Sequence, residues 1–191
     1  MTEASKEDMA GTLAKMVGAM VIYYAMLEHW IDGAVFCIFD RVEGAKAIRK
    51  QHPFNARDEL DFLRESFTKL DQLAPFKDEA LALLDKLDPL SDFRHDIVHG
   101  HIRRFDFSIG QLEFSRVVRG DQRQPVRRSL TITAENLFLK GREILALVEP
   151  FMGLTHRLVA KFDPEYKAEQ PAGSLGWSLA SVLPVIKKVS D

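Results

Sequence analysis

Residues Met16 to Phe39 read MVGAMVIYYAMLEHWIDGAVFCIF, and this apolar stretch decides the fold. Apolar side chains recur at spacings of three and four, which is typical of a helix that buries one broad face: Leu13, Met16, Val17, Met20, Tyr24, Leu27, Ile31, Val35 and Ile38. Glu28, His29 and Asp32 interrupt its middle, and such groups would be costly inside a bilayer. We therefore expect a core helix over about residues 6–40, and no membrane association.

Downstream of this helix, the sequence predicts a second helix that begins after Asn55, a good N-cap, and ends before Pro75. Its apolar face is Leu60, Leu63, Phe67 and Leu70. A third helix should run to about Leu87. Asp88-Pro89 then resembles an N-cap followed by proline at the first helical position, which predicts a separate short helix that Gly100 terminates.

Beyond Gly100 the apolar period changes from helical to alternating, as Phe105, Phe107 and Ile109 show. This predicts a small antiparallel β-hairpin or meander over about residues 102–132, followed by a last long helix over about residues 134–162. The fold class we expect is all-α: a bundle of four to five helices with the β-hairpin inserted before the last long helix. Residues 1–165 should form this domain, and residues 166–191 a tail with a short packed helix.

The composition indicates the cellular location of the protein more clearly than its function. A formal net charge of -2 gives no global indication of nucleic-acid binding. Cys37 is the only cysteine, so an intrachain disulfide is impossible. The polar N-terminus lacks the features of a secretory signal. We therefore expect a cytoplasmic protein.

The stretch with the residue types of a reaction site is Arg94-His95-Asp96-Ile97-Val98-His99-Gly100. Histidine can move a proton near neutral pH, and arginine stays charged and binds phosphate oxygens. Five helical positions separate Arg94 from His99 by roughly 140° and about 7.5 Å of rise. In a dimer with a two-fold axis, each groove could take residues from both chains, which would overcome this separation of Arg94 and His99. In the structural alternative, Arg94 pairs with a carboxylate and His99 caps the helix.

The segment from Phe93 to Gly100 resembles the signature of the HEPN superfamily: an arginine, a polar residue, then a histidine after four to six positions, often followed by glycine. Arg94 matches the arginine, His95 the polar residue, where Asn is commoner, and His99 the histidine. The resemblance covers roughly residues 7–162. It implies a dimeric helical bundle without a cofactor, often a metal-independent endoribonuclease of toxin–antitoxin or antiphage systems, with an antitoxin protein as partner. Some members bind RNA or nucleotides without cutting.

Two further groups are candidate site residues. Glu28 interrupts the apolar run of the first helix and could orient a histidine or pair with Arg94. Otherwise it belongs to a stripe of polar residues on the surface of that helix. The segment 102–130 holds seven arginines, three carboxylates and no lysine, a net charge of +4. Arginines among phenylalanines suit contact with single-stranded or structured RNA. We choose the following as RNA-binding: Arg103, Arg104, Arg127 and Arg128. The alternative is a solvated outer face of the sheet.

The same letters permit other functions. His95 and His99 are four residues apart, and with Asp96 and His101 they could bind a metal. His95-Asp96 also resembles the centre of HD-type phosphohydrolases, for which His52 and Asp163 would be the remaining candidate ligands. A third possibility is a non-catalytic dimeric interaction module. The leading interpretation is a HEPN-like protein that cleaves or binds RNA through Arg94 and His99 without a metal, with His95 and Glu28 assisting.

Overall fold

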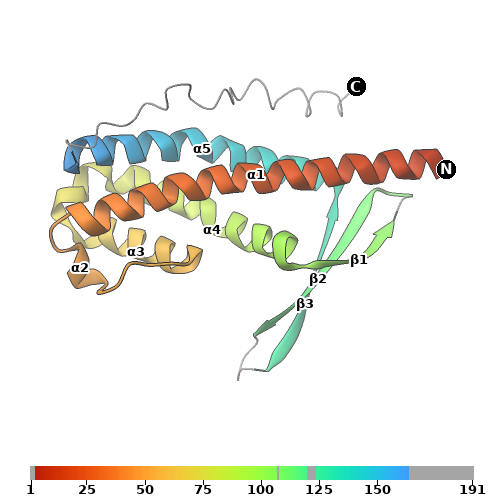
Figure 1. Cartoon of the computed structure of the whole chain (residues 1–191), viewed down its shortest axis with the longest axis horizontal. Coiled ribbons are helices and arrows are strands. Elements are labelled where there is room, and N and C mark those ends of the chain that lie inside the picture. The colour runs from red at the N-terminus through yellow and green to blue at the C-terminus, as the bar shows by residue number, and fades with distance from the viewer. Residues whose placement is uncertain (1–2, 107, 120–123, 164–191) are drawn as a thin grey trace.

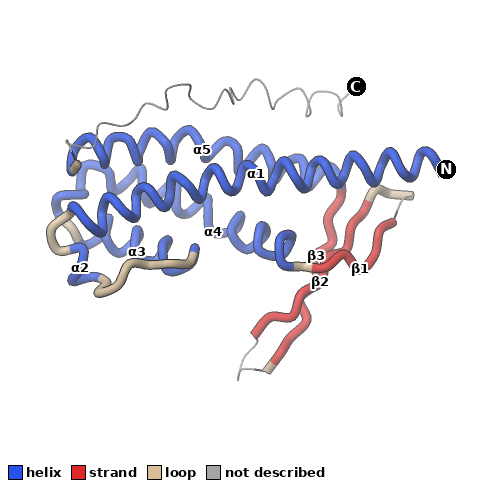
Figure 2. The backbone as a smooth tube through the Cα atoms, in the orientation of Figure 1, coloured by secondary structure: helices blue, strands red, loops and turns tan. Residues whose placement is uncertain are grey.

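Helices make up most of the structure, a computed structural model that describes residues 3–106, 108–119 and 124–163 (Figure 1). Its elements follow one another in this order: α1 (Glu3–Arg41), α2 (Ala45–Ile48), α3 (Ala56–Lys69), the 3₁₀ helix η1 (Asp71–Phe76), α4 (Lys77–His99), β1 (His101–Asp106), β2 (Gln111–Arg119), β3 (Pro125–Thr133) and α5 (Ala134–Phe162). α1 and α5 lie along each other, and α3 and α4 complete the bundle. The strands form an antiparallel sheet in the order β1-β2-β3 (Figure 2).

The fold is α+β, which corrects the all-α class expected from the sequence. The predominance of helix and the β insertion before the last long helix are confirmed. The insertion is a three-stranded meander whose inner face joins the common hydrophobic core, through Leu112, Phe114 and Ile132. The sheet is therefore a structural layer and more than an appended hairpin. The expected tail of residues 166–191, with its short helix, lies outside the described residues.

α1 buries the face that its apolar spacing predicts. Leu27, Val35 and Ile38 are fully enclosed, whereas Met16 and Val17 are partly buried. The opposite face is exposed. Of the most apolar 18-residue stretch of the helix, 28% is buried. Between Asp8 and Arg41, α1 is long and apolar enough to cross a membrane by length and composition alone. Its packing against α5 nevertheless makes it the centre of the bundle.

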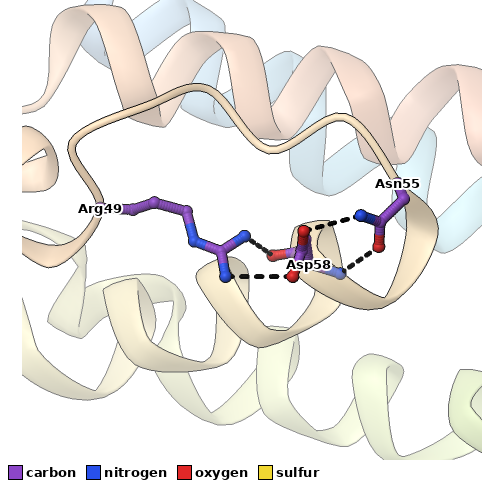
Figure 3. A network of polar contacts seen from close by, with 3 residues as sticks. All are labelled: Arg49, Asn55 and Asp58. Atoms are coloured by element: carbon purple, nitrogen blue, oxygen red, sulfur yellow. Dashed lines mark hydrogen bonds and ion pairs between the residues drawn. The ribbon is translucent and has the colours of Figure 1, made fainter.

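α3 begins at the N-cap that the sequence indicates (Figure 3). The Asn55 side-chain oxygen accepts a hydrogen bond from the Asp58 backbone N–H at 3.0 Å, and its amide donates to the Asp58 carboxylate at 2.7 Å. Arg49 donates to the same carboxylate at 3.1 Å. This arrangement satisfies a backbone donor of the first helical turn and fixes the entry of the chain into α3.

α4 is one continuous helix, so the prediction of a separate short helix starting at Asp88-Pro89 is wrong. Pro89 removes one backbone hydrogen bond, a cost of about 3 kcal/mol in a helix interior. The helix continues because Leu84, Leu87 and Leu90, on both sides of the proline, are almost completely buried. Their burial requires the same helical phase before and after Pro89.

The end of the sheet that consists of β2 and β3 projects away from the helices, below the bundle in Figure 1. β1 pairs with β2 only from Gln111 to Ser115, with an irregularity between Ile102 and Arg104. β2 and β3 remain paired from Gln111 to Arg119, so their distal halves form a two-stranded arm. Gly110, with φ of +57°, makes the turn between β1 and β2, where a residue with a side chain would be strained.

Candidate functional site

The last two turns of α4 separate the motif residues into a buried and an exposed set. Asp96 and Ile97 are 4% and 5% exposed, whereas His95 and His99 lie at the surface. The two imidazole rings are one helical turn apart, with centroids 4.4 Å from each other. The surface end of α4 therefore presents two imidazoles that solvent or a ligand can reach.

Arg94 points toward α1 rather than along α4. Its guanidinium lies 3.3 Å from the Glu28 carboxylate and 5.4 Å from the centre of the buried Tyr24 ring. Tyr24 in turn shares a hydrogen bond with Ser91, one turn before Arg94. Of the three possibilities for Glu28 (orienting a histidine, pairing with Arg94, or lying in a surface stripe), the structure has the pair with Arg94. This pair also matches the structural alternative, in which a carboxylate engages Arg94.

Asp96 connects the motif helix to the sheet. Its carboxylate pairs with Arg116 on β2 and, at 2.9 Å, with Arg128 on β3. Arg116 and Arg128 face each other across the two strands. Arg128 also lies 3.5 Å from Asp92. We call Asp96, Arg116 and Arg128 the Asp96 clamp, because these three residues hold the sheet against α4.

The clamp affects the nearby imidazole of His95. Burial lowers the pKa of His95, and the positive charges of Arg116, His99 and Arg94 lower it further, against an opposing effect of Asp96. An imidazole with an unperturbed pKa near 6.5 that is shifted downward is neutral at pH 7. His95 is therefore able to accept a proton or a hydrogen bond at neutral pH.

A group of carboxylates lies behind the Arg94–Glu28 pair. Burial raises the pKa of Glu28, an effect that Arg94 opposes and Asp32 reinforces. Burial raises the pKa of Glu59 on α3 to about 7, and the charges of Asp32 and Glu28 add to the shift. Arg94 is the cation that opposes the upward shift of the pKa of Glu28, on the α1 side of this group.

The four arginines expected to bind RNA do not form one surface. The register and the pleat place Arg128 on the inner face of the sheet and Arg127 on its outer face. Arg104 is opposite Glu113 on the outer face and lies 3.5 Å from Asp106. Arg103 sits at the strand irregularity, 3.7 Å from Glu113. Arg128 is engaged in the clamp, and Arg127 makes no ion pair with another described residue.

The metal-binding alternative loses its central ligand. Asp96 is buried, and each of its two carboxylate oxygens is paired with an arginine, Arg116 or Arg128. His52 instead packs against Phe36, with ring centroids 4.3 Å apart, and Asp163 pairs with Arg41. Over the described part of the chain, no group of three or more His, Cys, Asp and Glu residues is arranged to hold a metal ion.

Sequence reasoning missed the role of Arg116 and the partners of Asp96. The alternation of β2 carried a signal, because Phe114 and Arg116 share the inner face of the strand. Gly100 also has a steric role that the sequence does not reveal. A Cβ at this position would lie 2.2 Å from the Asp96 carbonyl oxygen and 3.3 Å from the Phe114 Cβ. The glycine allows the chain to leave α4 and enter β1 directly against the sheet.

Comparison with known proteins adds no relative to this geometry: no family model, curated protein or solved structure matches the chain.

Proposed function

We propose that this protein is a HEPN-like RNA-cleaving or RNA-binding protein in which Arg94 and His99 act on a phosphodiester without a metal. The observation that carries the proposal is the exposed His95–His99 pair in the last turns of α4, which follows Arg94 in the chain and whose His95 feels the charge of Arg94. Imidazoles supply proton transfer, and a guanidinium supplies a permanent charge for phosphate. The resemblance of residues 93–100 to the HEPN signature supports the same assignment.

In this mechanism His99 removes the proton of the RNA 2′-hydroxyl while the 2′-oxygen bonds to phosphorus. The bond from phosphorus to the 5′-oxygen breaks, and that oxygen receives a proton from the imidazole. Arg94 stabilises the charge that grows on the phosphate oxygens. Glu28 holds Arg94 through one edge of a group that has five N–H donors. Neutral His95 orients the substrate or assists in proton transfer.

Exposed arginines would position the RNA strand. Arg104 and Arg127 on the outer face of the sheet are the members of the predicted set best placed for this role, because neither is part of the clamp. Arg103, at the strand irregularity, is a further candidate for RNA contact. Arg128 would contact RNA only through the part of its side chain that remains exposed to solvent. The substrate is RNA, single-stranded or structured, of a kind that places a backbone phosphate at the exposed end of α4.

We further propose that the protein is a cytoplasmic homodimer whose interface includes the motif helix. Val98 and Ile102, which flank His99 in the sequence, are 38% and 58% exposed and would be covered by a second copy. The HEPN resemblance suggests that the protein is the toxin or effector of a toxin–antitoxin or antiphage system. An antitoxin protein would then neutralise it. Light scattering that gives a monomer at micromolar concentration would contradict the dimer.

A non-catalytic interaction module is the second candidate. Two observations favour it: Arg94 is engaged by Glu28, and Asp96 is engaged by Arg116 and Arg128. In that case the motif residues stabilise the junction between bundle and sheet, and the histidines have no chemical role. The metal-dependent HD-type alternative is disfavoured by the engagement of Asp96.

A panel of structured and unstructured RNAs, incubated with the protein in the presence of EDTA, tests the proposal. We expect one or more RNAs to be cut, or to be bound in a filter or mobility assay. Cleavage that EDTA abolishes and manganese or zinc restores would support the metal-dependent alternative. A protein that neither cuts nor binds any RNA of the panel would be assigned to the interaction modules.

A further inference from the structure

α1 exposes an apolar face that nothing in the described structure covers. Val21 and Ile22 are 37% and 45% exposed, and no other atom lies within 4 Å of a Cβ placed at Gly11 or Gly18. Between Gly11 and Leu27 the only charged side chain of α1 is Lys15. A face of this kind, on the helix that organises the core, is typical of a surface that another segment covers.

The C-terminal part of the chain has the matching chemistry. Residues 173–186 read GSLGWSLASVLPVI and contain no charged side chain. Leu175, Leu179 and Val182 are spaced by four and three, as on one face of a helix, and Pro184 limits how far such a helix could extend. The small residues of the α1 face leave room for these large side chains.

The attachment point of this segment is also suitable. α5 ends at Phe162, and the next residue, Asp163, pairs with Arg41 at the C-terminal end of α1, 3.0 Å apart. The nine residues 164–172 can span at most about 30 Å when extended. Along α1, the distance from Arg41 back to Ala25 is about 24 Å, sixteen residues at 1.5 Å each. Residue 173 can therefore reach the start of the exposed apolar face.

Length and charge agree with an antiparallel arrangement. A helix over residues 173–183 would be about 16 Å long, which equals the length of α1 from Ala25 to Ala14. Lys187 and Lys188 would then follow near the N-terminal part of α1, where Asp8 is exposed. We propose that residues 173–186 pack, in the same chain and antiparallel to α1, on the α1 face formed by Gly11, Ala14, Gly18, Val21, Ile22 and Ala25.

Hydrogen exchange on the full chain tests this proposal. We expect backbone amides within 173–186 to exchange more slowly than in a free peptide of the same sequence, by on the order of tenfold or more. Ile22→Glu should abolish that protection, because it buries a charge under the segment. The matched control is Val117→Glu, at a residue 68% exposed on β2, which should leave the protection unchanged. Circular-dichroism melts of both variants report whether the bundle remains folded.

Several outcomes would overturn the proposal. Tail amides that exchange as fast as the free peptide in the wild-type chain would do so, as would protection that survives in a folded Ile22→Glu protein. Protection that disappears on dilution would assign the face to a second copy of the chain. Binding of the wild-type chain to phosphatidylglycerol vesicles, lost in Ile22→Glu while the tail stays unprotected, would assign it to a lipid surface.

Discussion

The guanidinium of Arg116 on β2 holds the buried carboxylate of Asp96 on α4. This ion pair joins the sheet to the helix that carries His95 and His99. Arg128 from β3 engages the other carboxylate oxygen, so that two strands are attached to one side chain. The position of the arm relative to His95 and His99 therefore depends on a residue in the middle of the motif.

Asp96→Ala should destabilise the protein by about 3 kcal/mol, because it leaves the Arg116 charge unpaired at a largely buried position. The measurement is urea unfolding followed by circular dichroism. Asp92→Ala is the matched control. Asp92 is 70% exposed at its side chain and lies 3.5 Å from Arg128, so its loss should cost less than about 1 kcal/mol. Equal losses in the two variants would argue against the clamp.

Gly100→Ala should also destabilise the protein, by about 1–3 kcal/mol, since the new Cβ would overlap the Asp96 carbonyl oxygen and displace the chain between α4 and β1. Gly141→Ala on α5 is a useful comparison, because a Cβ there meets nothing within 4 Å. That substitution should leave the stability unchanged or raise it by up to about 1 kcal/mol through better helix propensity. Thermal melts of the two variants would distinguish the effects, and a neutral Gly100→Ala would contradict the close approach.

Glu59 should make the stability depend on pH. Burial raises its folded pKa to about 7 from an ordinary value of 4.5, so the folded state binds more protons than the unfolded state between those values. Stability from this group is present below about pH 4.5 and falls as the pH rises through 7. Glu59→Gln should therefore raise the melting temperature more at pH 8 than at pH 5. Asp61→Asn, at an exposed position on the same helix, is the control and should show no such difference.

RNA binding should depend on the outer-face arginines more than on the clamp. Replacing Arg104 and Arg127 together with alanine should weaken binding without loss of thermal stability. If each contacts a phosphate of single-stranded RNA, the slope of log K against log salt concentration should decrease by about 1.4. Arg128→Ala should instead lower the melting temperature, because the clamp loses one of its cations. An unchanged slope in the Arg104 and Arg127 variant would remove these residues from the interface.

The parts of the fold that follow from local periodicity could be predicted from the sequence. The core face of α1, the N-cap at Asn55 and the start of α5 after Thr133 are of this kind. The sequence predicts a helix start at Pro89, wrongly, because a proline in the first helical turn and one inside a helix have similar local sequences. Only the burial of Leu87 and Leu90 on a common face distinguishes them.

The site was predictable to a lesser degree, because its contacts are long-range. Arg94 and Glu28 are 66 residues apart, and the sequence left their contact as one of three possibilities for Glu28. The partners of Asp96 come from strands 20 and 32 residues later, and no local pattern selects Arg116 and Arg128 among seven arginines. The division of those arginines between two faces required the strand register.

The most direct test of the account is RNA cleavage by His99→Ala in the presence of EDTA, measured beside RNA binding by the same variant. We expect cleavage to be lost while binding stays within a few fold, because a proton carrier acts mainly in the transition state. Arg94→Ala should reduce both, since a phosphate contact exists in the ground state as well. His101→Ala, at an exposed residue outside the motif helix, should retain both. Cleavage that persists at the wild-type rate in a folded His99→Ala protein would contradict the account.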